Sequence, residues 1–312
     1  MKRTIFTLLL FSAIGLLSCR KSTVQLDIKQ QDQQEILNYI STNGISGMKR
    51  DTAGGDTSGI YYQTILPGIS GTSYKYSDSI AFVYTIHTFD GNYNSLDTTS
   101  NHFDDFTGHI AQRALPAGLQ LVIHDVLKRG GSIRVLIPSR LAYGISGYGT
   151  GSIMNINSRI AGNQCIDYYI HSINDEAAYD DLVIRNYIAQ NNLTGYKRTA
   201  DGLWYMLRTV GTGTSPITNN TTITATYTAS QLNGTIFDQY NTTDGTGTSF
   251  DIPDLVPGVQ EALKNYTTTG AIISLLIPSP IGYGRVSLSN GITPVPVNSV
   301  LHYEMAVISV SP

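Results

Sequence analysis

Residues 137–144 read IPSRLAYG and residues 277–284 read IPSPIGYG, so five of eight letters recur 140 positions later. Each copy closes an apolar run, SIRVLIP at 132–138 and AIISLLIP at 271–278. Both runs are apolar on both faces for most of their length, which is typical of a central strand buried on two sides. Two similar sites, one duplicated structural corner, or chance would each explain the repeat.

The repetition extends well beyond these phrases. NYISTNGISGMKR at 38–50 is echoed by NYIAQNNLTGYKR at 186–198, at an offset of 148. Further sets match in the same order: GIYYQTILPG (59–68) with GLWYMLRTVG (202–211), Tyr84 with Tyr227, and Asn163 and Tyr168 with Asn298 and Tyr303. A shared order with an offset that drifts through loop insertions indicates tandem duplication and excludes chance.

This duplication divides the chain into four parts. Residues 1–18 are predicted to be a signal peptide, and residues 19–33 a polar tether with few large apolar groups to pack. The first unit then covers residues 34–174 and the second residues 176–312. Each unit is expected to open with a short leader helix. In the second unit, apolar residues recur at helical spacing at Tyr179, Leu182, Val183, Tyr187 and Ile188.

Strands and one further helix follow in each unit. Apolar residues alternate over 80–86, 223–227 and 301–307, which predicts strands. A stripe at helical spacing is present in both units: Leu119, Val122, Ile123, Val126 and Leu127 in the first, and Val259, Ala262, Leu263 and Tyr266 in the second. Each unit is therefore predicted to be an α+β domain, an antiparallel sheet with one helix packed on a face.

The N-terminus reads as a processing segment. A basic pair precedes an apolar run at 5–17 that is too short to cross a bilayer. The run ends in Leu-Leu-Ser-Cys, which resembles the lipobox of bacterial lipoproteins and implies lipidation of Cys19. The residues after Cys19, at 20–21, are basic and therefore lack an acidic retention signal. This favours a protein that is lipid-anchored at the outer membrane of the bacterial cell envelope and faces the periplasm. A plain signal peptide with a chance cysteine is the alternative.

Several other chemistries find no support in the sequence. A net charge of −3 provides no basic field, so nucleic acid is not an expected partner. The six histidines lack close metal-ligand spacing, and no G-x-S-x-G elbow is present. Cys165, in a strand-like run, is expected to be a small buried apolar residue rather than a catalytic thiol. The sequence therefore predicts neither a metal nor a cofactor.

The order of motifs resembles a known family. It is similar to the motif order of the FKBP (macrolide-binding) peptidyl-prolyl cis-trans isomerases: G-aromatic-Y, Y, DG, FD, L-V-P-G, a helix, IPS..YG and P.N..L.Y. Residues 202–311 carry the pattern nearly throughout, and residues 59–174 carry a degraded copy. The resemblance implies a half-wrapped sheet around one helix, with an aromatic pocket that receives a prolyl ring. It implies an isomerase, or rotamase, that acts on proline-containing polypeptides.

The resemblance also implies a site in the second unit. Its catalytic residues would be Tyr227, Phe237, Asp238, Val256, Tyr283 and Tyr303, with substrate-binding residues Phe250, Leu255, Val259 and Val295. In this assignment the Tyr283 hydroxyl and the Val256 N–H orient substrate carbonyls. Val259 departs from the family, which usually has a Trp as the pocket floor, and a Val offers less surface for stacking.

In the first unit the resemblance implies a weakened or inactive copy of the site. The matching residues are Tyr84, Asp97, Leu115, Leu119, Tyr143, Ile160 and Tyr168. Leu96 stands where an aromatic is expected, and Leu119 replaces the floor Trp. Pro116 falls where the family uses a backbone N–H to hold a substrate carbonyl, and proline has no N–H.

Two functions of different classes remain open at this point. The first is a tethered prolyl isomerase that assists folding of extracytoplasmic proteins, with the second unit as the working site. The second is a non-catalytic chaperone or assembly module that binds extended peptides after both pockets have decayed. The departures at Val259, Leu119 and Pro116 favour the binding module. The tyrosines, Phe237 and Asp238 retained in the second unit favour the enzyme.

Overall fold

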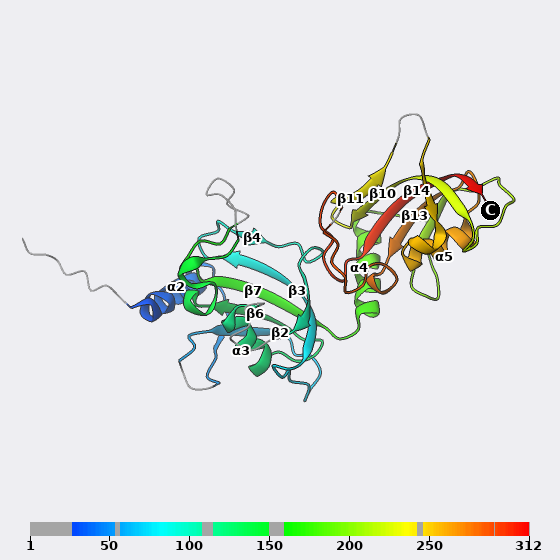
Figure 1. The fold of residues 1–312 in the computed structure, drawn as a ribbon. Coiled ribbons are helices and arrows are strands. Elements are labelled where there is room, and N and C mark those ends of the chain that lie inside the picture. The colour runs from blue at the N-terminus through cyan, green and yellow to red at the C-terminus, as the bar shows by residue number, and fades with distance from the viewer. Residues whose placement is uncertain are drawn as a thin grey trace, which may run out of the picture.

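The computed structural model describes residues 27–53, 57–107, 115–149, 159–241, 246–289 and 291–311. The predicted signal peptide, Cys19 and the first part of the tether lie outside these ranges. The described chain forms two antiparallel seven-stranded sheets, one in each unit, joined by a short connection (Figure 1). Among the described residues, no helix is both long and apolar enough to cross a membrane.

The first sheet has the strand order β1-β2-β6-β7-β3-β4, with β5 also paired to β3. Its strands are β1 (Lys49–Arg50), β2 (Tyr61–Leu66), β3 (Ser79–Thr88), β4 (Asn94–Ser95), β5 (His102–Phe106), β6 (Ser132–Ile137) and β7 (Ile166–Ile173). Helix α3 (Ala117–Asp125) packs on one face of this sheet.

The second sheet repeats this topology strand for strand, in the order β8-β9-β13-β14-β10-β11, with β12 paired to β10. Its strands are β8 (Lys197–Arg198), β9 (Trp204–Thr209), β10 (Thr222–Gln231), β11 (Ile236–Tyr240), β12 (Thr248–Asp251), β13 (Ile272–Ile277) and β14 (Leu301–Ser311). Helix α5 (Pro257–Tyr266) is the counterpart of α3. The predicted α+β class, two similar antiparallel domains with one packed helix each, is confirmed.

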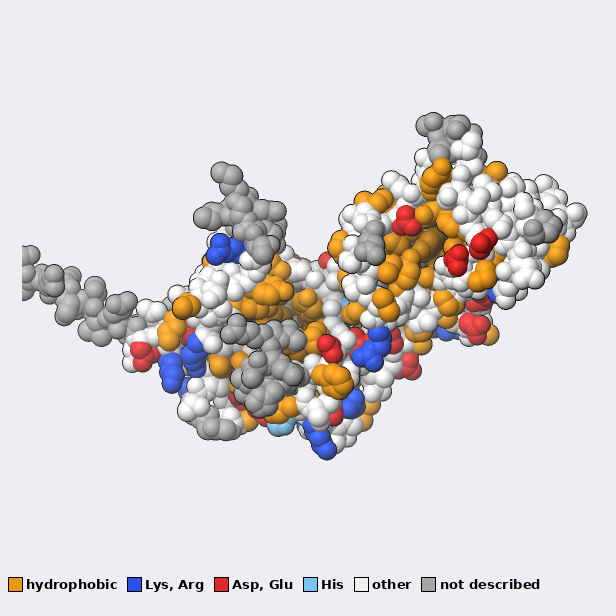
Figure 2. Space-filling model, viewed as in Figure 1, with side chains coloured by type: hydrophobic (Ala, Val, Ile, Leu, Met, Phe, Trp, Pro, Cys, Tyr) orange, Lys and Arg blue, Asp and Glu red, His pale blue; other side chains and the backbone are white. Residues whose placement is uncertain are grey.

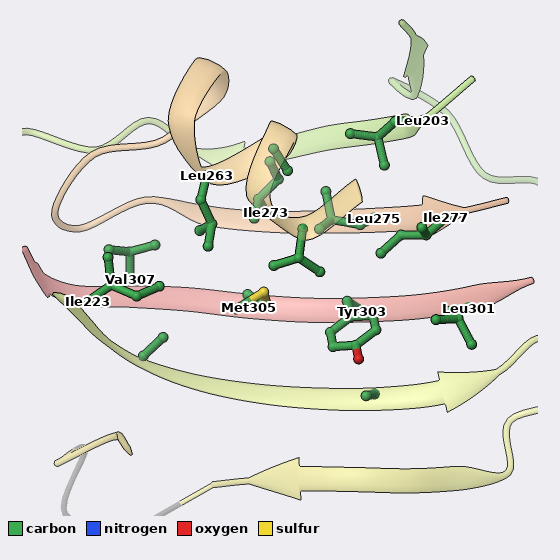
Figure 3. Close-up of a cluster of buried hydrophobic side chains, with 14 of the residues drawn as sticks. Leu203, Ile223, Leu263, Ile273, Leu275, Ile277, Leu301, Tyr303, Met305 and Val307 are labelled. Carbon is green, nitrogen blue, oxygen red and sulfur yellow. The ribbon is translucent and has the colours of Figure 1, made fainter. Parts of the chain in front are cut away.

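The core of the second unit lies between α5 and the central strands. Leu263 of α5 points toward the strands that carry Ile273 and Met305 (Figure 3). Full burial of side chains of this size contributes about 1.5–3 kcal/mol each. The helix lies close to the sheet because its second residue is glycine: a Cβ at Gly258 would lie 2.6 Å from Ile277 Cγ2. Gly118 of α3 meets Ile137 in the same way, at 2.5 Å.

A leader helix precedes each sheet, α2 (Ile28–Thr42) and α4 (Glu176–Gln190). Asp27 and Asp175 cap them, since each carboxylate accepts a hydrogen bond from the backbone N–H three residues on, at 3.0 Å. The boundary predicted for the tether is wrong at its end, because residues 28–33 are helical. Their polar composition concealed the helix, and Asp32 is the buried residue among them.

The repeated IPS phrase is where each leader helix attaches. Ser139 and Ser279 are fully buried at the start of the short 3-10 helices η1 (Ser139–Leu141) and η5 (Ser279–Ile281). The Ser139 hydroxyl donates to buried Asp32 at 2.6 Å. In the second unit, the hydroxyl and N–H of Ser279 both donate to Asp180, each at 2.7 Å. The phrase therefore marks a duplicated structural corner.

The Tyr-Gly pair and the downstream asparagine of each repeat complete the same corner. Gly144 and Gly284 have φ values of 59° and 57°, and Asn163 and Asn298 have 58° and 53°. These left-handed conformations suit glycine and asparagine best. Each asparagine N–H then donates to its glycine carbonyl, at 2.8 and 2.7 Å. The repeated letters are thus explained by backbone geometry as well as by the leader-helix contact.

Polar contacts join the two units. Asp104 of β5 accepts hydrogen bonds from Arg285 at 2.6 Å and from Asn298 at 2.9 Å. In the turn between β10 and β11 of the second unit, the Asn233 side-chain amide donates a hydrogen bond to Asp97 of the first unit at 2.7 Å. In these three contacts unit one contributes the carboxylates and unit two the donors, whereas the Ser100 hydroxyl of unit one donates to Gln231 of unit two at 3.2 Å.

Candidate active site

Aromatic rings from several strands meet in the second unit. Tyr227 lies on β10 and Tyr303 on β14, with ring centroids 6.4 Å apart. Phe250 of β12 meets the Tyr227 ring edge-on at 5.4 Å, and Phe237 of β11 meets Tyr303 edge-on at 6.0 Å. These offset and edge-to-face arrangements are the ones that aromatic pairs prefer. Tyr283, in the turn after η5, closes the group at 6.1 Å from Phe237.

The polar groups of this cluster are themselves hydrogen-bonded. The Tyr227 hydroxyl donates to Asp238 at 2.8 Å, and the hydroxyls of Tyr283 and Tyr303 lie 3.2 Å apart. Burial, followed by the bond to Asp238, raises the pKa of Tyr227 well above its usual value. Burial is also the main cause of the raised pKa of Tyr303. Both phenols therefore stay neutral at physiological pH, and the carboxyl group that binds Tyr227, that of Asp238, lies at the exposed edge of the cluster.

The start of α5 packs against the same cluster. Val256 is the N-cap residue, with φ −61° and ψ 147°, and its N–H has no acceptor in the described part of the chain. The preceding carbonyl is held in place, because the Gln260 side-chain amide donates to Leu255 O at 2.7 Å. Val259, 1% exposed, lies one residue before Gln260 and belongs to the core beneath the rings.

All ten residues predicted for the second unit lie in one region. Phe237, Val259, Val295 and Tyr303 are buried members of the core cluster, and Tyr227, Phe250, Leu255, Val256 and Tyr283 pack against it half-buried. Asp238 joins through its bond to Tyr227. Val295 lies there because it pairs with Leu288 through two backbone hydrogen bonds of 3.0 and 2.9 Å.

The first unit encloses an aromatic pocket of about 650 Å³. Five of the seven residues predicted there line it: Tyr84, Leu115, Leu119, Tyr143 and Tyr168. Ile160 is buried in the adjoining core. The hydroxyls of Tyr143 and Tyr168 lie 2.7 Å apart, which reproduces the Tyr283–Tyr303 pair. Four lining aromatics were missed by the sequence reasoning: Phe82, Tyr93, Phe103 and Tyr148. The alternation over 80–86 could have indicated Phe82.

Asp97 does not belong to this pocket, and its assignment by sequence match is wrong. In the second unit Asp238 pairs with Ala229 of β10. The equivalent position on β3 is Ile86, and its partner is Ser95. Asp97 is exposed beyond the end of the two-residue strand β4 and accepts hydrogen bonds from Thr99, Ser100 and Asn233 instead. Leu96, 63% exposed, is not a pocket wall either.

The backbone at the helix start is nevertheless the same in both units. Pro116 is the N-cap residue of α3, with φ −55° and ψ 142°, values close to those of Val256. Gln120 donates to Leu115 O at 2.8 Å, as Gln260 does to Leu255. The two positions differ in one group: Val256 has a backbone N–H that can donate a hydrogen bond, whereas Pro116 has none.

Within the described residues, one trio brings possible metal-ligand atoms within 4.8 Å of one another: Asp32, Glu35 and Cys165. Asp32 already accepts hydrogen bonds from Ser139 and Arg140. Burial raises the pKa of the Cys165 thiol, so the thiolate that a metal needs is disfavoured. These residues do not fit an ion.

Comparison with known proteins agrees with this geometry. Residues 213–308 match the family described as FKBP-type peptidyl-prolyl cis-trans isomerase. A protein named FKBP-type peptidyl-prolyl cis-trans isomerase FkpA, from Buchnera aphidicola subsp. Schizaphis graminum, is 34% identical over 120 residues, which is 38% of this chain and 45% of that protein. A peptidyl-prolyl cis-trans isomerase Mip from Coxiella burnetii is 34% identical over 122 residues, 39% of this chain and 50% of that protein.

A third relative, named outer membrane protein MIP from Legionella longbeachae, is 31% identical over 109 residues, 35% of this chain and 44% of that protein. The chain spans about half the length of the curated relatives it matches. The stretch that matches the family model, residues 213–308, lies within the C-terminal unit. The first unit shares the sheet topology and the helix-start geometry of the second unit.

Proposed function

We propose that the second unit is a peptidyl-prolyl cis-trans isomerase acting on proline-containing polypeptides. The observation that carries this proposal is the convergence of the rings of Tyr227, Phe237 and Tyr303 in one cluster. Val256 packs against the same core, and its N–H has no acceptor among the described residues. The rings suit the apolar, uncharged prolyl ring, and the N–H suits a peptide carbonyl next to it.

The reaction requires no nucleophile or metal. Uncatalysed X–Pro exchange takes tens of seconds, so a turnover of about 10 s⁻¹ requires about three decades, near 4 kcal/mol. A planar amide is stabilised by charge-separated resonance, which the twisted transition state has largely lost. An apolar aromatic hollow therefore disfavours the planar ground state relative to the twisted state, while the Val256 N–H and the Tyr283 hydroxyl hold carbonyls in place.

A protease-coupled assay on a proline tetrapeptide tests this proposal. We expect Asp238→Ala to lower kcat/KM about tenfold, because it removes the acceptor that fixes the Tyr227 hydroxyl, a hydrogen bond to a charged group. Asp201→Ala, which removes an exposed carboxylate from the turn before β9, is the matched control and should keep full activity. Equal, near-background rates for wild type and Asp238→Ala would contradict an enzyme and favour a non-catalytic peptide-binding module.

We further propose that the protein is lipid-anchored through Cys19 in the bacterial envelope, facing the periplasm at the outer membrane, where it assists protein folding. The lipobox-like Leu-Leu-Ser-Cys at 16–19 supports this, as does the name of the Legionella longbeachae relative. Cys19→Ser should move the protein from the membrane fraction to the soluble fraction and abolish incorporation of labelled fatty acid. Continued labelling of that variant would contradict the anchor.

A further inference from the structure

We propose that the pocket of the first unit binds a proline or another bulky apolar side chain of an unfolded polypeptide without isomerising it, and so holds the client whose prolyl bond the second unit rotates. The identity of this client rests on the proposed function of the second unit. The ligand site itself rests on features of the first unit, which are independent of that proposal.

The size and walls of the pocket fit an apolar group. Its volume of about 650 Å³ lies within the range of ligand sites, and aromatic side chains enter it from three strands and from the turn after η1. One charged residue is present in its described lining, Arg140, and that guanidinium already pairs with Asp32 at 3.2 Å and hydrogen-bonds backbone carbonyls of the 57–58 segment. An uncharged ligand is therefore favoured over an anion or a cation.

The pocket lacks the groups proposed to catalyse rotation in the second unit. Pro116 supplies no N–H at the helix start, and Ser95 occupies the register position that Asp238 holds in the second unit. The Tyr84 hydroxyl consequently has no carboxylate partner, and it makes no hydrogen bond to another described residue. Apart from Arg140, which is already paired, what remains is an apolar wall with tyrosine hydroxyls. Such a wall can bind a side chain but lacks the N–H that is proposed to hold the peptide carbonyl in the second unit.

The rim of the pocket extends this apolar surface into solvent. Ile145 is 84% exposed, and Tyr148 is 59% exposed while its ring stacks on Tyr143 at 4.8 Å. In the second unit the corresponding turn carries Arg285, which is occupied by the bond to Asp104. Directly after the Tyr-Gly pair, the first unit therefore has an exposed apolar side chain, Ile145, where the second unit has a charged one. Space filling shows hydrophobic side chains gathered on the same viewed face of both units (Figure 2).

The two sites are held together by the contacts between the units. On β5, Phe103 lines the first pocket and the next residue, Asp104, bonds to Arg285. Arg285 lies two residues after Tyr283 of the second site. A polypeptide bound at the first pocket would therefore present its other segments to the second site at an effective concentration on the order of millimolar.

Two full-length variants test the inference, neither of them in the proposed catalytic site. Ala117→Trp fills the first pocket from the first residue of α3, and Ile145→Ser removes the apolar rim. Ile69→Ser is the matched control, a 50% exposed isoleucine that does not line the pocket. For each variant, kcat/KM is measured on a tetrapeptide and on an unfolded protein whose refolding is limited by proline isomerisation.

We expect Ala117→Trp and Ile145→Ser to lower kcat/KM on the protein substrate about tenfold, through KM, and to leave tetrapeptide activity within about twofold. Ile69→Ser should change neither. Unchanged activity on the protein substrate in both variants would overturn the inference, and so would a parallel loss on both substrates. Because Ile145 is exposed, its variant remains informative should Ala117→Trp fail to fold.

Direct binding separates this inference from the isomerase proposal. The Kd of a fluorescently labelled, permanently unfolded polypeptide should rise about tenfold in Ala117→Trp and Ile145→Ser. It should stay unchanged in Ile69→Ser. A chain with no tetrapeptide activity but with this pattern of Kd values would refute the isomerase and leave the holding site standing. Equal Kd values across the four proteins would refute the holding site alone.

Discussion

The start of the helix that packs on each sheet has the same backbone in both units but differs in one hydrogen-bond donor, the N–H that Val256 has and Pro116 lacks. Val256 and Pro116 have nearly the same backbone angles, and Gln260 and Gln120 fix the preceding carbonyl in the same way. The corner with its buried serine is also shared. The fold was therefore kept through the duplication while the hydrogen-bonding groups around each aromatic cluster changed, which shows that the architecture does not depend on the chemistry of the site.

The largest expected effect tests whether the two units unfold separately. Leu263→Ala removes most of a fully buried side chain of α5 and should destabilise the second unit by about 2–5 kcal/mol. Denaturant unfolding followed by site-specific fluorophores in each unit measures this. We expect the transition of the second unit alone to move to lower denaturant concentration, since the units share few hydrogen bonds. An equal shift of both transitions would show that the interface makes them one cooperative body.

The next effect is a pH dependence of the stability of the second unit. Burial, with repulsion from Asp180 and Asp104, raises the pKa of Glu176 to about 8, and burial raises that of Asp180 to about 6. Both folded-state values exceed the unfolded ones. The associated stability is therefore complete below about pH 4 and is lost as pH rises through 6 to 8. At Glu176's place the first unit has Ile28, at the offset of 148.

Replacement of that carboxylate checks this prediction. Between pH 5 and 8 the free energy of unfolding of the second unit should fall by about 2 kcal/mol in the wild type. The fall should be smaller in Glu176→Gln, which is neutral at every pH. Glu35→Gln, on the exposed side of α2, is the control and should keep the wild-type slope. An identical slope in Glu176→Gln would show that Glu176 titrates near its ordinary value.

A smaller effect is expected from copying the first unit into the second. Val256→Pro removes the N–H while φ −61° already suits proline, and the extended backbone of Leu255 suits a residue before proline. We expect tetrapeptide kcat/KM to fall about tenfold, near 1.4 kcal/mol, with little change in stability. Val256→Ala keeps the N–H and serves as the control. Full activity in Val256→Pro would remove this donor from the mechanism.

The smallest effect concerns the corrected residue. Asp97→Ala should leave tetrapeptide kcat/KM within about twofold, because Asp97 faces Asn233 and not a pocket. Asp238→Ala on the same substrate provides the comparison. A large loss in Asp97→Ala would show that the interface between the units controls the second site.

Much of the fold could be predicted because both copies obey periodic patterns. Alternation over 80–86 and 223–227 identified β3 and β10, and the drifting offset identified the duplication. The helix at 28–33 could not be read, since its buried residue is a carboxylate, and carboxylates are ordinarily exposed. Asp97 was misplaced because strand pairing, not letter matching, fixes which residue opposes β3.

The attachment of the leader helices determines where a stable fragment of either unit can begin. The stretch that matches the family begins at residue 213, beyond α4. A fragment started there would leave the hydroxyl and N–H of Ser279 facing an emptied position, without the carboxylate that binds both. Loss of such a buried acceptor costs about 1–3 kcal/mol for each unsatisfied group. The smallest autonomous C-terminal piece should therefore begin at its capping residue, Asp175.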